Sequence, residues 1–364
     1  MLLSEIMNCL ERWAPLSLQE SYDNSGLQCG APDQEITGAL LALDVTEAVL
    51  EEAITSGCNL VVAHHPLIFT GLKKITGANA TERILERAIR HQIAVYAIHT
   101  NLDHTATGVN HRIATKLGLV RPRILAPLEN HLWKLVTYVP QAHAEAVRNA
   151  LFAAGAGVMG NYDSCSFSSS GEGTFRALAG AQPFTGAPGV LHREAETRLE
   201  LIFPLHRKQA VLLALRSTHP YEEIAYDLLA LQNPWMEAGA GLLGELEEAM
   251  PEMEFLTRVK VRMNTALVRH TALTGRSVKK VAVCGGSGFF LLPQAKQAGA
   301  DVLLTADIKY HQFFEAEGKL LLADVGHFES EQFTGELILD YLQKNLPTFA
   351  PRLSKINTNP VHYL

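Results

Sequence analysis

The sequence predicts an α/β protein in which parallel strands alternate with helices, and three observations support this prediction. Apolar runs of strand length alternate with segments of helical periodicity in both terminal parts of the chain. These two parts share a helix-turn-strand pattern at residues 53–62 and 295–304. Between them the pattern of elements changes. At 364 residues the chain is long enough for two domains, or for one domain split by an insertion.

The first part begins with residues 1–13, where Glu5 and Glu11 interrupt the apolar positions and no basic segment opens the chain. This pattern favours an amphipathic helix over a signal peptide. A helix is expected to end at residue 56, because Gly57 is a typical C-terminal stop. The elements that follow alternate in type: a strand at 40–43, a helix at 47–56, a strand at 60–63, a helix at 81–91 and a strand at 93–98.

The last part repeats this order, with a strand at 278–283, a helix at 290–297 and strands at 302–304 and 320–325. In the shared pattern His65 aligns with Asp307. Two related halves packed about a pseudo-twofold axis would bring their strand ends face to face. The match is short, however, and any alternating helices and strands share part of it.

The middle of the chain predicts an inserted α+β domain. A strand at 132–139 and a helix at 144–154 lead into a Gly/Ser-rich passage, and a strand at 198–203 and a helix at 208–216 follow. This β-α-β, β-α-β order is typical of a ferredoxin-like module. We therefore expect three segments: residues 1–127 as the first half of an α/β domain, 128–240 as the insert, and 241–364 as the second half.

Composition narrows the class of protein. Hydrophobic residues make up 47% and charged residues 19%, which excludes a disordered chain, and no apolar run has membrane-spanning length. The formal charge of −7 argues against a nucleic-acid surface. Five cysteines without CxxC spacing argue against a disulfide framework, so we expect a cytoplasmic protein with core thiols.

Imidazoles and carboxylates follow three of the predicted strands. His64-His65-Pro66 ends one strand, residues 99–103 (His-Thr-Asn-Leu-Asp) end another, and residues 326–331 (Gly-His-Phe-Glu-Ser-Glu) end a third. Parallel strands bring such residues to one edge of a sheet, and nitrogen with oxygen ligands suits zinc, iron, manganese, nickel or cobalt. Pro66 ends its strand, so both histidines can turn toward neighbouring ions. An isolated His-His pair would more often be structural.

The chain resembles the NIF-three-like dinuclear metal centre proteins, whose members are often named GTP cyclohydrolase 1 type 2 homologues. The resemblance covers essentially the whole chain, although Tyr22 stands where the family often has Trp. It rests on six motifs: residues 22–27 (YDNSGL), 43–46 (LDVT), 64–69 (HHPLIF), 99–103 (HTNLD), 307–311 (DIKYH) and 326–331 (GHFESE).

The resemblance implies a site, a partner and a relationship for the insert. It implies two divalent metal ions, held by His64, His65, Asp103, His327 and Glu331. It also implies a toroidal homohexamer. Through residues 171–176 (GEGTFR), 183–186 (PFTG) and 219–223 (HPYEE), the insert is similar to the PII/CutA-like module of the family's long form.

Spacing and family pattern suggest how these five ligands divide. His327 and Glu331 stand four residues apart, so a helix would place both on one face. A carboxylate has two oxygens and can bridge two cations. We therefore expect Glu331 to bridge, with Asp103 and His65 on one ion and with His64 and His327 on the other.

Five further residues are candidates for supporting roles near the same sheet edge. His99 is expected to orient a ligand through a hydrogen bond, or to be an ordinary strand-end histidine. Asp44, Asp307, Lys309 and His311 are candidates for substrate contact or proton transfer, or they only cap turns.

The leading functional hypothesis is a metal-dependent hydrolase acting on a nucleotide or phosphoester-type small molecule. The glycine-rich turn at residues 285–288 would hold an anionic group of such a substrate, unless it is only a tight strand-helix connection. The alternative is a non-catalytic metal-binding regulatory or scaffold hexamer whose insert senses a small molecule. No catalytic residue is singled out by the sequence.

Overall fold

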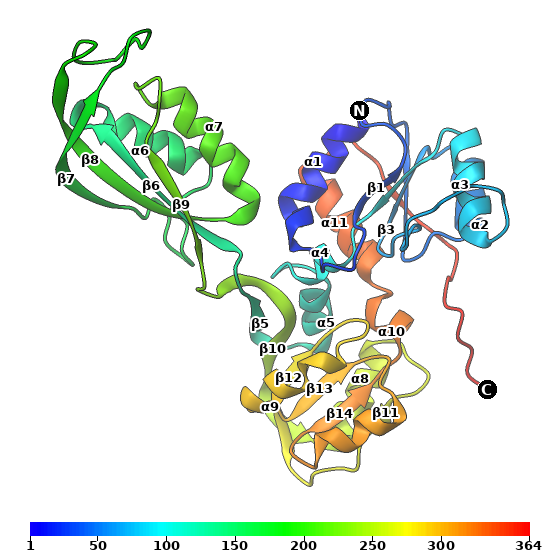
Figure 1. The fold of residues 1–364 in the computed structure, drawn as a ribbon. Helices are drawn as coiled ribbons and strands as arrows, with labels where there is room; N and C mark the ends of the chain where they lie inside the picture. Colours follow the sequence, from blue (N-terminus) through cyan, green and yellow to red (C-terminus); the bar gives the residue numbers. More distant parts are fainter. The chain divides into compact units, whose positions relative to one another are not determined.

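The computed structural model describes residues 1–364, which form two compact units. Unit 1 comprises Met1–Ala126 together with Ala238–Leu364, and unit 2 comprises Pro127–Glu237, against an expected insert of residues 128–240. The two units are drawn in Figure 1. No helix is both long and apolar enough to cross a membrane.

One sheet of unit 1 is built mainly from the N-terminal part of the chain. Its three central strands are parallel and every residue in them is buried, as expected for a sheet covered on both faces. In spatial order the strands are β1 (Gly26–Cys29), β4 (Ala94–Ala97), β3 (Leu60–Ala63), β2 (Ala39–Ala42) and β15 (Arg352–Leu353). The helices of this part are α1 (Leu3–Trp13), α2 (Glu47–Thr55), α3 (Ala80–Arg90), α4 (Thr100–Asp103) and α5 (Val109–Leu117), with the 3-10 helix η1 (Leu16–Leu18).

The second sheet of unit 1 is built mainly from the C-terminal part. Its strands in spatial order are β11 (Arg269–His270), β14 (Leu321–Asp324), β13 (Val302–Thr305), β12 (Ser277–Val283), β10 (Trp235–Pro251) and β5 (Val120–Leu128). The helices of this part are α8 (Glu252–Arg262), α9 (Leu292–Gln297), α10 (His327–Glu331) and α11 (Thr334–Asn345), with the 3-10 helices η4 (Phe289–Leu291) and η5 (Tyr310–Ala316).

The two sheets of unit 1 share a core arrangement. In one, β2, β3 and β4 are parallel neighbours with β1 antiparallel beside β4; in the other, β12, β13 and β14 are parallel neighbours with β11 antiparallel beside β14. One buried apolar cluster includes Leu41 and Val62 from the first sheet and Val281 and Leu304 from the second. The carboxyl ends of both sets of strands are therefore parts of one compact body.

Unit 2 has the predicted β-α-β-β-α-β order. Its antiparallel sheet has the spatial order β7 (Phe167–Arg176), β8 (Leu191–Pro204), β6 (Leu132–Pro140) and β9 (Tyr226–Leu231). The helices α6 (Ala144–Ala153) and α7 (Lys208–Thr218) follow the short 3-10 helices η2 (Gln141–His143) and η3 (Leu205–Arg207). Side chains of both helices pack with those of β6 and β8 in a separate core.

The sequence did not locate two of these strands, β7 and β9. β7 lies in the Gly/Ser-rich passage, which has little intrinsic strand preference. It forms because it pairs along its whole length with β8, from Phe167 opposite Glu200 to Arg176 opposite Leu191. For the same reason β8 begins at Leu191, well before the predicted start at residue 198.

Candidate metal centre

His64 is fully buried at the end of β3, and its ring presents a free nitrogen to two carboxylates. The Nδ1 atom lies 2.8 Å from the carbonyl oxygen of Ile98, which can only accept, so Nδ1 carries the proton. Its Nε2 lies 3.7 Å from Asp103 Oδ1 and 3.8 Å from Glu331 Oε1. Neither this Nε2 nor Asp103 Oδ1 has a hydrogen-bond partner, although both atoms are buried. These separations are too long for hydrogen bonds but suit atoms that share one metal ion at about 2 Å each.

The next histidine belongs to a second group. His65 Nδ1 is 2.7 Å from Asp44, and His327 Nδ1 is 2.7 Å from Asp307, so each ring presents its Nε2. These two Nε2 atoms lie 3.0 and 3.1 Å from Glu331 Oε2 and 3.3 Å from each other. A carboxylate behind an imidazole is the usual support of a metal-binding histidine.

The structure therefore divides the five side chains differently from the expected pairing. Asp103 groups with His64, and His65 groups with His327, with Glu331 common to both groups, while a third group joins His64 and His65 with His99. Both histidines follow the end of β3 and face Glu331. His64 Nε2 lies beside Asp103, whereas His65 Nε2 lies beside His327 on α10.

Local structure explains these positions. Glu331 lies one helical turn after His327 in α10, so both face the same side. That helix begins after Gly326, which has φ +90°. Asp307 also has a left-handed backbone, with φ +56°, and accepts from Ser287 as well as contacting His327. A strained residue held by two polar contacts is typical of a functional site.

The carboxylates of the centre favour positive charge beside them. Burial raises the pKa of Asp103 to about 7, and the charge of Glu331 adds to this effect. Burial also opposes ionisation of Glu331, but hydrogen bonds with imidazoles, that of His327 first, hold its pKa well below the usual value. Burial alone would lower the pKa of His65 and His327; contacts with carboxylates outweigh it and raise these pKa values to about 9 and about 11. The neighbouring carboxylates therefore favour the protonated form of both histidines.

Most amides of the glycine turn at residues 285–288 are used within the protein, which argues against the phosphate-cradle alternative. Three of its amides already donate to side-chain oxygens of the protein: Gly285 to Asn110 at 2.9 Å, Gly286 to Ser330 at 2.9 Å and Gly288 to Thr305 at 2.8 Å. Gly286 instead leaves space for the carboxylate of Glu331, because a Cβ atom at residue 286 would lie 2.5 Å from Glu331 Oε1.

His99 lies beside this centre without a hydrogen bond to any of the five expected ligands. Its ring centroid is 5.2 Å from that of His64 and 5.3 Å from that of His65. Its Nδ1 lies 2.8 Å from Asp23, a carboxylate that also accepts from Ser25 and Thr100. Burial opposes ionisation of Asp23, yet these hydrogen bonds hold its pKa far below the usual value. Asp23 lies in a motif of the family resemblance, but its role was not predicted.

The other candidates separate into two kinds. Asp44 and Asp307 hold the two histidines of the second group. Lys309 and His311, in contrast, are exposed at the start of η5 and line neither cavity beside the centre. They follow Asp307 closely in sequence, but the chain turns away from the centre after that residue.

Two cavities open onto the centre. One of about 400 Å³ is lined by His65, His327 and Glu331, and by the exposed aromatic side chains of Tyr22, Phe69 and Phe290. The other, of about 470 Å³, shares the two histidines but not Glu331. Both volumes are in the range of small-molecule sites.

The fold and the site define an α/β protein with a cluster of histidines and carboxylates that could hold a metal ion, built from both halves of unit 1. The family model for Duf34/NIF3 (NGG1p interacting factor 3) matches residues 1–360, and the chain belongs to that family.

Relatives and a solved structure agree with this assignment. The chain is 39% identical over 366 residues to the "GTP cyclohydrolase 1 type 2 homolog" of Bacillus subtilis, covering 99% of this chain and 98% of that protein. It is 42% identical over 325 residues to the protein of the same name from Halalkalibacterium halodurans, covering 88% and 87%. A Bacillus cereus protein related to NIF3 has a crystal structure with a TM-score of 0.88 and 39% identity, covering 100% of this chain and 99% of that one.

Proposed function

We propose that this protein binds two divalent cations and hydrolyses a nucleotide or phosphoester-type small molecule. In this proposal His64 and Asp103 hold one ion, His65 and His327 hold the other, and Glu331 bridges them. The observation that carries it is Glu331, whose Oε1 faces one group while its Oε2 faces the other. Two bound cations would polarise a substrate and lower the pKa of a coordinated water.

The surroundings of the centre support the choice of substrate. The exposed aromatic side chains in the cavity of about 400 Å³, Tyr22, Phe69 and Phe290, offer flat apolar faces to a heterocyclic ring. The five ligands serve two ions, which leaves coordination positions for water and substrate. The name of the relatives, GTP cyclohydrolase 1 type 2 homolog, agrees with a nucleotide substrate.

The test combines metal analysis with a substrate screen. Metal content is measured on protein purified from its native source, and turnover of nucleotides, cyclic amides and phosphoesters is compared between wild type and Glu331→Gln. We expect about two ions per chain in the wild type and loss of both metal and turnover in the variant. Glu336→Gln, on the surface of α11 where it pairs with Lys116, is the control. Protein that contains about two ions per chain but turns over none of these substrates would refute the proposed hydrolase activity.

A second candidate is a metal-dependent scaffold without catalysis. It is favoured by the origin of the ligands, because His64, His65 and Asp103 come from the first half of unit 1 and His327 and Glu331 from the second. Cations would then cross-link the halves. His64→Ala distinguishes the two functions: a scaffold loses stability or assembly, whereas an enzyme loses turnover while its assembly persists.

We also propose that the chain assembles as a homohexamer. Exposed aromatic side chains on η5 support self-association, because Tyr310 is 72% and Phe314 66% exposed and their rings lie 5.6 Å apart. Light scattering coupled to size-exclusion chromatography gives the number of subunits. We expect six, and we expect fewer for Tyr310→Ser with Phe314→Ser; a monomeric wild type would contradict the assembly.

Two smaller proposals complete this interpretation. The order β7-β8-β6-β9 supports a relationship of unit 2 to PII/CutA-like modules. The five cysteines are all free, which supports a reducing compartment such as the cytoplasm.

A further inference from the structure

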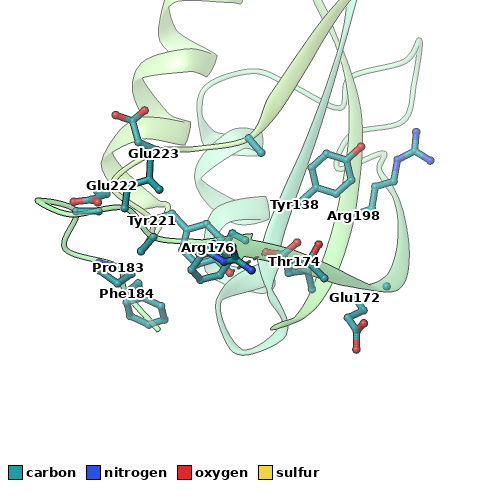
Figure 2. Close-up of a pocket in the computed structure, with 18 of the residues that line it drawn as sticks. Tyr138, Glu172, Thr174, Arg176, Pro183, Phe184, Arg198, Tyr221, Glu222 and Glu223 are labelled. Carbon is teal, nitrogen blue, oxygen red and sulfur yellow. Dashed lines mark hydrogen bonds between the residues drawn. The ribbon is translucent and has the colours of Figure 1, made fainter. Parts of the chain in front are cut away.

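Unit 2 contains a cavity of about 730 Å³ that has no part in the metal centre. Its walls are strand β7, the hairpin loop that follows it and the segment after α7 (Figure 2). The volume is within the range of sites for small organic molecules. All the lining residues belong to unit 2.

Aromatic rings form one wall of this cavity. Tyr221 lies 6.1 Å from Phe175 and 6.2 Å from Phe184, measured between ring centroids, and both pairs are tilted. Phe184 is 53% exposed, although it belongs to a cluster of rings. Ring faces in such a wall attract apolar groups and, through their quadrupoles, cations.

A buried carboxylate lies against this wall. Glu196, on β8, is only 9% exposed, and its Oε1 accepts a hydrogen bond of 2.8 Å from the Tyr221 hydroxyl. Burial raises the pKa of Tyr221, so its hydroxyl stays a neutral donor. Glu196 has no cationic partner, and its Oε2 makes no hydrogen bond within the protein. A buried carboxylate normally has a cation beside it, because burial without one is costly.

The backbone of β7 is adapted to this carboxylate. A Cβ atom on Gly173 would lie 2.2 Å from Glu196 Oε2. Glycine at that position therefore lets the side chain of Glu196 lie along the strand, inside the cavity. The same reasoning explains why a strand of low intrinsic preference carries a glycine here.

The remaining charges around the cavity are mainly negative. Its lining includes four carboxylates and two guanidinium groups. Glu222 and Glu223 lie at one end and Arg198 with Tyr138 at the other, with Arg176 between them (Figure 2). Arg198 is already paired with Glu200 at 3.0 Å, whereas Arg176 makes no ion pair.

We propose that this cavity binds a small organic cation, whose ammonium or guanidinium group donates hydrogen bonds to Glu196 while its body lies against the rings of Phe175, Phe184 and Tyr221. Two sources share this chemistry. One is a polyamine, which carries only positive groups. The other is a basic amino acid, whose carboxylate would pair with Arg176.

The experiment measures binding of spermidine, L-arginine and choline to the full chain by calorimetry, in 150 mM salt and after chelation of metals, so that the metal centre does not contribute. We expect spermidine or arginine to bind, and choline, which has no N–H donor, to bind at least about tenfold more weakly. Arg176→Ala separates the sources, because it weakens binding of arginine but not of spermidine.

Glu196→Gln keeps the shape of the side chain and is expected to weaken binding at least about tenfold. Glu223→Gln removes one negative charge from the same cavity at an exposed position, and we expect it to change affinity less than threefold. Gly173→Ala should act like Glu196→Gln by displacing that carboxylate. Circular dichroism and thermal unfolding of each variant establish that unit 2 remains folded.

Three results would overturn the proposal. One is that neither spermidine nor arginine binds at millimolar concentration. Another is that folded Glu196→Gln binds as tightly as the wild type. The third is that Glu223→Gln weakens binding as much as Glu196→Gln, which would indicate attraction to the general negative charge alone.

Discussion

His64, His65 and His327 have one feature in common: the Nδ1 atom of each is bound by an oxygen of the protein, and each Nε2 faces Glu331. This fixes which nitrogen each ring offers before any ion arrives. Placing negatively charged carboxylates close together in a buried site costs free energy, and either protons on the histidines or bound cations would offset this cost. The two compete for the same atoms.

This competition predicts that metal affinity rises with pH. The pKa values of His65 (about 9) and His327 (about 11) lie above neutrality, so both rings are protonated at pH 7 without metal. An ion must displace these protons, and affinity therefore falls as the pH is lowered. Calorimetric titration with zinc at pH 7, in buffers of different ionisation enthalpy, should show release of roughly two protons per chain. Heats that do not depend on the buffer would contradict this.

A second prediction at the residue scale concerns Gly286. An alanine Cβ would approach Glu331 Oε1 to 2.5 Å, so Gly286→Ala should displace the shared carboxylate and weaken metal binding at least about tenfold. Gly299→Ala is the matched control, since Gly299 also has a positive φ (+68°) but nothing within 4 Å of the added atom. Its backbone strain costs roughly 1–2 kcal/mol without touching the centre. Equal metal affinities for the two variants would show that the close approach is unimportant.

At the scale of elements, the start of α3 depends on one carboxylate. Glu82 accepts hydrogen bonds from the backbone of Thr76 and Ala78 and from the Thr76 hydroxyl, and these hold its pKa at about 2. A carboxylate whose pKa is lower in the folded than in the unfolded state stabilises the folded protein at pH values above its unfolded-state pKa. That stabilisation is lost as pH falls from about 4.5 toward 2.

Glu82→Gln is therefore expected to lower the urea midpoint at pH 7, and the difference from wild type should shrink as the pH is lowered toward 3. Urea unfolding at pH 7, 5 and 3 provides the comparison. Glu86→Gln, on the same helix and paired with Arg90 at the surface, serves as control. A difference that stays constant with pH would mean that the charge of Glu82 is not what stabilises the helix start.

At the scale of the whole molecule, both halves of unit 1 supply residues of the candidate metal centre, whereas unit 2 supplies none. Metal bound only by the folded state adds about 2.7 kcal/mol of stability at a free concentration 100 times Kd, or roughly 5–10 °C in Tm for a body of this size. Scanning calorimetry should show that chelation lowers the Tm of unit 1 and leaves unit 2 unchanged. Glu331→Gln should abolish the shift, and an equal shift in both units would disprove this local linkage.

Much of this architecture could be predicted from the chain itself. The alternation of apolar runs and helices gave β2, β3, β4, β12, β13 and β14 nearly at their observed bounds. Five of them are buried on both faces, and β12 is buried over its last three residues, so each carries a continuous apolar signal there. β7 was not predicted from the sequence, because its residues have little strand preference and only pairing with β8 stabilises them as a strand. The family relationship was also readable from motifs, and the match over residues 1–360 confirms it.

The sequence by itself determined the strand ends that carry imidazoles and carboxylates, since local periodicity shows where each strand stops. Only the tertiary structure decided which of those side chains meet. It grouped Asp103 with His64, put Asp307 behind His327, left Lys309 outside and used three amides of the glycine turn within the protein. The physical reason is that orientation at a strand end depends on packing between two sheets distant in sequence, and no local pattern encodes that packing.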